Sequence, residues 1–305
     1  MDLIKPNTNI NFVERMKILV FISWALILIG IISLIYHRGP NWGVEFVGGT
    51  EVHVKFAKSI GSDEIRKILS SAEYPVEAVQ QLGLPQNNEY LLRFSPKVVP
   101  FEKIKQFRER LEGVFKKATG AGGAHILRID YIGPKVGAEL INKAIISVVL
   151  GCLGILLYLK VRFEWEFAMG AVFAIVHDVL ITIGAISITN KEFTLTIIAA
   201  LLTIIGYSVN DTIIIFDRIR ENLRKATKPG FRQLVNDGIN QTLSRTILTV
   251  ITVFLVLVSL FFLGGSVIHD FAFTMIVGVV TGTYSSIFIA SAFVVYWRYR
   301  KGALT

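Results

Sequence analysis

The chain has 305 residues, of which 52% are hydrophobic and only 18% are charged, and its mean hydropathy is +0.56. This composition excludes an ordinary soluble protein, which carries more charge and interrupts its apolar runs sooner. The net charge of +9 does not indicate a nucleic-acid partner, because the basic residues gather beside the apolar runs.

Six apolar runs approach or exceed the roughly 20 residues that a helix needs to cross a bilayer. The first lacks a small-residue cleavage site and is too long for the apolar part of a signal peptide, so we interpret it as a retained helix. The single cysteine, Cys152, lies inside such a run, which excludes an internal disulfide. The predicted spans cover residues 16–36, 139–159, 165–188, 194–216, 246–264 and 271–296.

Lysine and arginine residues predict the orientation of these spans. They gather in the N-terminal segment 1–15, in the links after spans two and four, and in the tail 297–305, which all lie on one side. The short loops on the other side contain only one basic residue, Lys191. By the positive-inside rule, both termini are expected in the cytoplasm.

Residues 37–138, between spans one and two, are charged and predict an extracytoplasmic domain. Strands are expected at 50–57, 76–82, 89–95 and 125–132, and helices at 62–72, with Ser62 as N-cap, and at 100–118, with Pro100 at its start. The order β-α-β-β-α-β indicates a ferredoxin-like α+β domain, a fold that hosts many functions. We find no metal-ligand cluster, nucleophile elbow or phosphate loop in it, and we expect His53 and His125 to have packing or surface roles.

Polar residues interrupt two of the predicted spans. Span three contains His177 and Asp178, and span four contains Asn210 and Asp211. An Asp near the centre of a membrane helix costs about 2.5–3.5 kcal/mol and usually faces the bundle interior, where it marks an ion pathway. Asp211 lies about 8 Å from the apparent end of its span, too far for its short side chain to reach water easily. We therefore predict a functional role for Asp211 and for Asp178.

Arg245 is a candidate partner for Asp211. It lies at the predicted cytoplasmic mouth of span five, which runs antiparallel to span four, so both residues are expected at similar depth. Such a pair can exchange partners as the carboxyl gains or loses a proton, and Thr246 is expected to line the same face. Alternatively, Arg245 anchors the helix end to lipid phosphate.

Small residues predict where helices approach closely. Gly278, Gly282 and Ser286 recur every fourth residue on span six and form a ridge suited to packing. Gly206 and Asn210 are one turn apart on span four, so we expect a close-packed face there, with Asp211 rotated away from it by about 100°. Residues 217–240, between spans four and five, are expected to form a cytoplasmic amphipathic segment. Within it, "FDRIRENLRKATKPG" is expected to continue span four as a helix on the membrane surface, which "KPG" ends.

Four motifs, in this order, carry a family resemblance over nearly the whole chain: "GVEFVGGT", "GYSVNDTIIIFDRIREN", "SRTILT" and "GVVTGTYSSIFIASAFV". They resemble the SecF family, the smaller partners of SecD in the bacterial Sec translocase. The first motif, at the start of the outer domain, includes Glu45, Gly48, Gly49 and Thr50. Glu45 stands where the family usually has Asp, which keeps the charge and lengthens its reach.

The resemblance implies a subunit of the inner-membrane export machinery that forms, with SecD, one transporter of the resistance-nodulation-division superfamily. Protons are the implied coupling ion, with no other cofactor and no metal. The implied partners are SecD, the SecYEG channel with SecA acting upstream, unfolded exported chains and membrane lipids. By motif position, Asp211 and Arg245 fall where the family places its proton-relay residues; Asp178 is a third candidate, with Asn210, His177 and Thr246 as supporting polar groups.

Three other functions are weighed against this one. An exporter of small amphiphiles from the same superfamily usually has larger outer domains and both six-span halves in one chain. An intramembrane aspartyl protease would need Asp178 and Asp211 to face each other, and such families carry Gly-x-Gly-Asp where this chain has "GYSVND". A passive scaffold would use its buried polar groups only to set the register of the helices.

Overall fold

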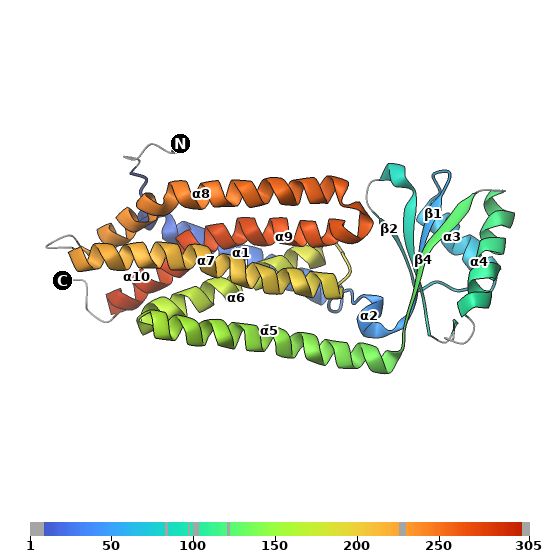
Figure 1. Ribbon diagram of the computed structural model, residues 1–305, viewed down its shortest axis with the longest axis horizontal. Helices are drawn as coiled ribbons and strands as arrows, with labels where there is room; N and C mark the ends of the chain where they lie inside the picture. The colour runs from blue at the N-terminus through green and yellow to red at the C-terminus, as the bar shows by residue number, and fades with distance from the viewer. Residues whose placement is uncertain are drawn as a thin grey trace. The chain divides into compact units, whose positions relative to one another are not determined.

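The computed structural model describes residues 9–82, 85–96, 98–99, 104–120, 123–225 and 230–300. The chain divides into two compact units. The helical unit comprises the residues up to Asn41 together with those from Ile146 onward, and the α+β unit comprises Trp42–Ile145 (Figure 1). Each unit has a hydrophobic core of its own.

Among the described residues, six helices are long and apolar enough to cross a membrane, which confirms the predicted fold class. They are α1 (Phe12–Tyr36), α5 (Pro134–Arg162), α6 (Trp165–Ile188), α7 (Leu195–Lys225), α8 (Phe231–Leu263), and a last helix made of α9 (Gly265–Ser285), the π-helical turn η3 (Ser286–Ala290) and α10 (Ser291–Arg300). About half of the apolar stretch of α6, α7 and the last helix is buried, compared with 6% for α5. Helices α6 and α7 and the last helix therefore form the centre of the helical unit. Helix α5, by contrast, exposes apolar side chains suited to contact with hydrocarbon.

The segment between spans four and five agrees with the prediction in its first half, where the helix of span four continues, and differs from it in its second half. Helix α7 continues to Lys225, and α8 already begins at Phe231, so residues 231–245 belong to a membrane helix. Phe231, Val235 and Ile239 are buried in the core of the helical unit. The prediction of a cytoplasmic segment is therefore wrong for 231–240, because that stretch begins α8 and packs one apolar face into the bundle. The predicted stop at Lys228 and Pro229 lies outside the described residues.

Glycines allow two close helix contacts in the helical unit. A Cβ at Gly30 of α1 would lie 2.8 Å from the Cα of Gly184 of α6, so the two backbones touch there. Gly282 of α9 lies against Ser208 of α7, and a Cβ at Gly278 would overlap the side chain of Ile204. The expected close-packed face through Gly206 is wrong, because no atom of another described helix lies within 4 Å of where its Cβ would be.

The α+β unit has the predicted β-α-β-β-α-β order. Its antiparallel sheet has the strand order β2-β3-β1-β4, built from β1 (Gly49–Phe56), β2 (Ala78–Leu82), β3 (Glu89–Phe94) and β4 (Ala124–Ile132). Helices α3 (Ser62–Ser71) and α4 (Ile104–Thr119) cover one face of the sheet (Figure 1). A short helix, α2 (Val44–Val47), precedes β1, and a 3-10 turn, η1 (Pro85–Asn87), joins β2 to β3.

Alternation along the strands explains which face is covered. Val52 and Val54 of β1 point into the core, whereas His53 between them bonds to Glu89 at 3.1 Å. The prediction that Ser62 caps α3 is wrong: the cap is Gly61, and Ser62 is the first helical residue. Pro100, the predicted start of the second helix, lies outside the described residues, and His125 is exposed.

The motif at the start of the α+β unit contains two glycines whose backbone angles other residues rarely adopt. Gly48 and Gly49 have φ angles of 79° and 134°, a region that side chains rarely adopt. A Cβ at Gly49 would also lie 2.6 Å from the carbonyl oxygen of Phe94, so β1 and β3 approach closely there. Thr50, the next residue, is fully buried. These positions explain why the motif needs glycine.

Glu45 of this motif has a partly buried carboxyl group. One of its oxygens has no hydrogen-bond partner among the described residues. Burial raises the pKa of Glu45, against the lowering effects of a backbone hydrogen bond and of the nearby Arg93 charge. Arg93 itself donates to the carbonyl oxygen of Trp42 at 2.9 Å, which ties β3 to the segment before α2.

We expect Gly49→Ala to destabilise the α+β unit by about 1–3 kcal/mol, because the methyl group meets a backbone oxygen and the φ angle is unfavourable. Hydrogen exchange of peptides from β1 and β3 in the purified protein measures the loss of protection. Gly113→Ala is the matched control, since open space surrounds Gly113 in α4 and alanine favours a helix by about 1 kcal/mol. Equal protection in Gly49→Ala and the native chain would contradict this prediction.

Candidate functional site

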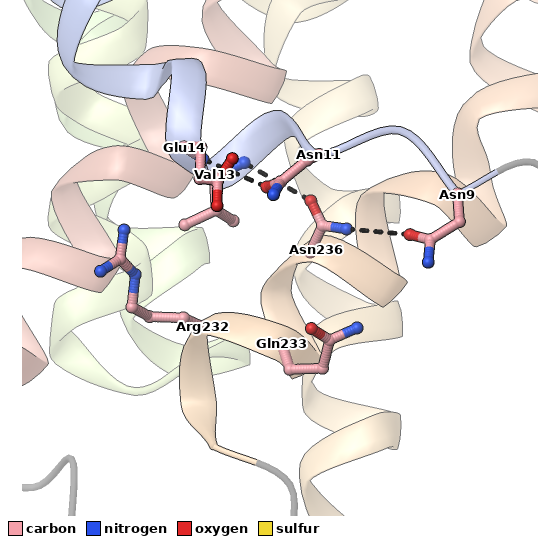
Figure 2. Close-up of a pocket in the computed structure, with 7 residues that line it drawn as sticks. All are labelled: Asn9, Asn11, Val13, Glu14, Arg232, Gln233 and Asn236. Atoms are coloured by element: carbon pink, nitrogen blue, oxygen red, sulfur yellow. Dashed lines mark hydrogen bonds between the residues drawn. The ribbon is translucent and has the colours of Figure 1, made fainter.

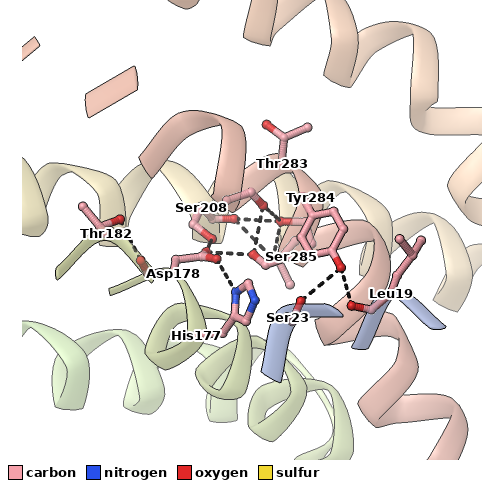
Figure 3. Close-up of polar contacts among 12 residues, drawn as sticks. Leu19, Ser23, His177, Asp178, Thr182, Ser208, Thr283, Tyr284 and Ser285 are labelled. Carbon is pink, nitrogen blue, oxygen red and sulfur yellow. Dashed lines mark hydrogen bonds and ion pairs between the residues drawn. The ribbon is translucent and has the colours of Figure 1, made fainter. Parts of the chain in front are cut away.

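Asp178 is the centre of a buried polar cluster that joins three helices (Figure 3). One carboxylate oxygen bonds to Nδ1 of His177 at 2.9 Å. The other accepts hydrogen bonds from the hydroxyl of Ser208 on α7, at 2.5 Å, and from that of Ser285 on α9, at 2.7 Å. The side chain is 1% exposed. Three neighbouring groups therefore replace the water that an exposed carboxylate would have.

The close approach of α7 and α9 explains how this cluster forms. Gly282 lies against Ser208, and Ser285 follows Gly282 by almost one turn on α9. A larger residue at 282 would push α9 away and move the Ser285 hydroxyl out of reach of Asp178. The predicted packing residues Gly278 and Gly282 thus lie at the contact that positions a buried charge.

His177 extends the cluster toward α1. Its ring stacks on Tyr284 with centroids 6.1 Å apart. The Tyr284 hydroxyl donates to the carbonyl oxygen of Leu19, at 2.5 Å, and accepts from Ser23, at 3.0 Å (Figure 3). Ser208, Ser285 and Tyr284 each lie within one of the four sequence motifs, but their roles in this cluster were not predicted.

Ser286 lies at the start of the π-helical turn and connects it to α7. Its hydroxyl bonds to that of Thr212 at 2.8 Å and lies 2.9 Å from the carbonyl oxygen of Gly282. The hydroxyl of Ser291 donates to the Ser286 carbonyl oxygen, across the turn, at 3.2 Å. Ser286 is therefore more than a small residue at a helix contact. Its side chain links α7 to the last helix at the start of the π-helical turn.

Asp211 has a different environment from Asp178, although both are 1% exposed. Neither oxygen of Asp211 has a hydrogen bond of good geometry to any described residue. The side chain of the neighbouring Asn210 lies within hydrogen-bonding range of it, and the Arg245 guanidinium on α8 acts on it as a nearby charge. Arg245 and Asn210 are themselves exposed, whereas Thr246 is buried and its hydroxyl also lacks a described partner.

The two carboxylates do not form a catalytic dyad. Asp178 bonds to His177, Ser208 and Ser285, whereas Asp211 bonds to none of these. Since they share neither a bond nor a proton, the arrangement does not support an aspartyl protease. Among the described residues, no three His, Cys, Asp or Glu side chains come together as metal ligands.

A polar pocket of about 480 Å³ lies where the segment before α1 meets the first turns of α8 (Figure 2). Asn236 accepts from the backbone N–H of Phe12, at 2.9 Å, and Asn240 bonds to both the N–H and the carbonyl of Ile10. These amides fix the start of α1 against α8. The pocket is lined by Asn9, Asn11, Val13, Glu14, Arg232, Gln233 and Asn236.

Comparison with known families identifies two matching regions. The family described as "Protein export membrane protein SecD/SecF, C-terminal" matches residues 113–300, more than half of the chain. The "SecD/SecF GG Motif" family matches residues 33–60, which include Gly48 and Gly49.

Individual relatives agree with these matches. The protein translocase subunit SecF of Calditerrivibrio nitroreducens is 40% identical over 298 residues, which are 96% of each chain. The protein translocase subunit SecDF of Thermus thermophilus is 36% identical over 306 residues, which are 99% of this chain and 40% of the relative.

A solved structure extends the agreement to the fold. A crystal structure of SecDF, a translocon-associated membrane protein from Thermus thermophilus, matches with a TM-score of 0.86 at 35% identity, over 98% of this chain and 40% of that one. The matching region there is part of a longer SecDF chain, which supports association of this chain with SecD. The chain therefore belongs to the SecF members of the SecD/SecF family, which are protein translocase subunits.

Proposed function

We propose that this chain, together with SecD, uses the proton gradient across the bacterial inner membrane to help complete the translocation of exported proteins. SecYEG is the channel from which it draws unfolded chains, and SecA acts upstream. The charge pattern favours an orientation with both termini in the cytoplasm, which places the α+β unit on the outer side, where emerging chains arrive.

One observation carries the proposal: Asp211 is buried in a membrane helix with neither oxygen hydrogen-bonded to a described residue. A buried carboxylate without partners is costly, so a site that keeps one has a use for its charge. The positive charge of Arg245 on α8 partly compensates the negative charge of Asp211. When Asp211 is protonated, this compensation is no longer needed. When Asp211 gains or loses a proton, the attraction between α7 and α8 changes. This change can drive a movement of the two helices.

Asp178 takes a supporting part in this proposal. Its three hydrogen bonds hold α6, α7 and α9 together, so a change in its protonation would disturb the centre of the bundle. We assign it a structural role in keeping the frame against which α7 and α8 act. This assignment differs from the first expectation, in which Asp178 was a third proton-relay candidate.

Arg245→Lys tests the role of the planar guanidinium. We expect the gradient-driven part of export into inverted membrane vesicles to fall several-fold, because a lysine is a more strongly hydrated point charge on a differently shaped side chain. Arg224→Lys, at an exposed position in the last turn of α7, is the matched control. Native coupling in Arg245→Lys would instead favour an anchoring role beside lipid phosphate.

A further inference from the structure

Four buried polar atoms on α7 and α8 lack a hydrogen-bond partner among the described residues. They are the two carboxylate oxygens of Asp211, the hydroxyl of Tyr207 and the hydroxyl of Thr246. Leaving a buried polar atom unpaired costs about 1–3 kcal/mol, and native proteins rarely accept this several times in one region. Internal water is the usual partner of such groups, provided that several polar atoms surround it.

Tyr207 lies four residues before Asp211 on α7, so the two side chains share a face of the helix. Its ring packs on the apolar cluster between α7, α8 and α9, which includes Ile204, Leu257 and Met275. The hydroxyl and the Asp211 carboxylate are close enough to interact electrostatically. Packing therefore fixes the ring and leaves the hydroxyl as a polar group near Asp211.

Of the charged groups on the helices that pack against α7, one acts on Asp211 and the others have partners of their own. On α8, the Arg245 charge acts on Asp211 directly. On α6, Asp178 and His177 bond to each other. On α9, Asp270 pairs with Lys191. Among the described helices that contact α7, the groups seen to act on Asp211 are thus Arg245, Asn210 and the Tyr207 hydroxyl.

We propose that Asp211, Thr246 and Tyr207 enclose an internal water site between α7 and α8. Tyr207 is then a positioning residue, whose hydroxyl orients the groups that transfer a proton to Asp211. This inference rests on the proposed function and adds to it the species that delivers the proton. Because α7 runs toward the cytoplasm in the expected topology, Tyr207 lies on the outer side of Asp211, from which protons enter.

The transfer is a simple exchange between oxygen atoms. A hydronium ion in the site loses one O–H bond and becomes water, while a new O–H bond forms on the Asp211 carboxylate. Tyr207 keeps its own proton throughout and donates a hydrogen bond that orients the water or the carboxylate. Thr246, which can donate and accept, completes the surroundings of the water from α8.

Tyr207→Phe, which removes only the hydroxyl, is the test. We expect the pH at which gradient-driven export is half-maximal to rise by about half a unit or more, because the charged carboxylate loses a donor that favours it. The infrared C=O band of protonated Asp211, identified by its loss in Asp211→Asn, is expected to move to higher wavenumber in the purified complex with SecD. Tyr158→Phe, on the exposed surface of α5, is the matched control.

Each other outcome overturns part of this account. A pH profile and an infrared band that match the native complex would show that the hydroxyl does not act on Asp211. Higher thermal stability of Tyr207→Phe with native coupling would show that the hydroxyl is merely unpaired, and failure to assemble would show a packing role. Thr246→Val provides a second, nearly isosteric variant, for which the same shift is expected. If Asp211→Asn keeps gradient-driven export, the proposed function itself fails, whatever Tyr207→Phe does.

Discussion

Asp211→Asn is expected to abolish the part of export that a proton gradient drives. The amide has nearly the shape of the carboxyl group but cannot take up or release a proton, so the attraction between α7 and Arg245 on α8 becomes fixed. Because Asp211 makes no hydrogen bond to a described residue, the substitution breaks no structural bond, and the complex with SecD is expected to assemble normally. Export into inverted membrane vesicles, measured with and without a gradient, checks both statements.

The control for this substitution is Asp217→Asn on the same helix. Asp217 forms a half-exposed ion pair with Arg162 at 2.8 Å, and such pairs contribute about 0–1 kcal/mol. We expect it to keep gradient-driven export. Stimulation by the gradient in Asp211→Asn equal to that of the native complex would remove Asp211 from the coupling mechanism.

Asp178→Ala is expected to destabilise the helical unit by about 3–5 kcal/mol, the cost typical of removing one partner from a buried charged network. The change leaves His177, Ser208 and Ser285 without their acceptor at the centre of three helices. Thermal unfolding of the purified protein in detergent measures the loss. Asp178→Asn, which keeps an acceptor oxygen, is expected to cost less.

Glu139→Ala on α5 is the control for this stability measurement. Glu139 is exposed and pairs with Lys143, one turn away, so we expect no measurable change in thermal stability. Native stability in Asp178→Ala would mean that the hydroxyl groups find other acceptors, such as the backbone carbonyl of Gly282 that Ser285 already contacts at 3.1 Å. The structural role assigned to Asp178 would then be wrong.

The membrane helices and the order of elements in the α+β unit were predictable because apolar length and strand alternation are properties of local sequence. The start of α8 was not, since Arg232, Asn236 and Asp237 give its first turns a polar composition. Only the packing of Phe231 and Val235 into the bundle shows that this stretch continues a membrane helix. Where one buried face decides the fold, overall polarity is misleading.

In the candidate site, too, some features were predictable from local sequence and others depended on packing. Asp178 and Asp211 were found because a carboxylate in an apolar run is conspicuous. Their different environments depend on which helices meet, and a ridge of small residues does not specify the face that it contacts. Gly278 lies against Ile204 and not against the face of Gly206, so the Ser208 and Ser285 hydroxyls that reach Asp178 could not be assigned from spacing alone.

The contact between Gly30 and Gly184 limits how this protein can evolve. Most tight contacts allow compensation, in which one residue becomes larger while its neighbour becomes smaller. Here the three atoms nearest to a Cβ at either position are backbone atoms of the other glycine, and glycine is already the smallest residue. A lineage that replaces either one must therefore move α1 away from α6, and with it the Leu19 and Ser23 contacts of Tyr284, in a single step.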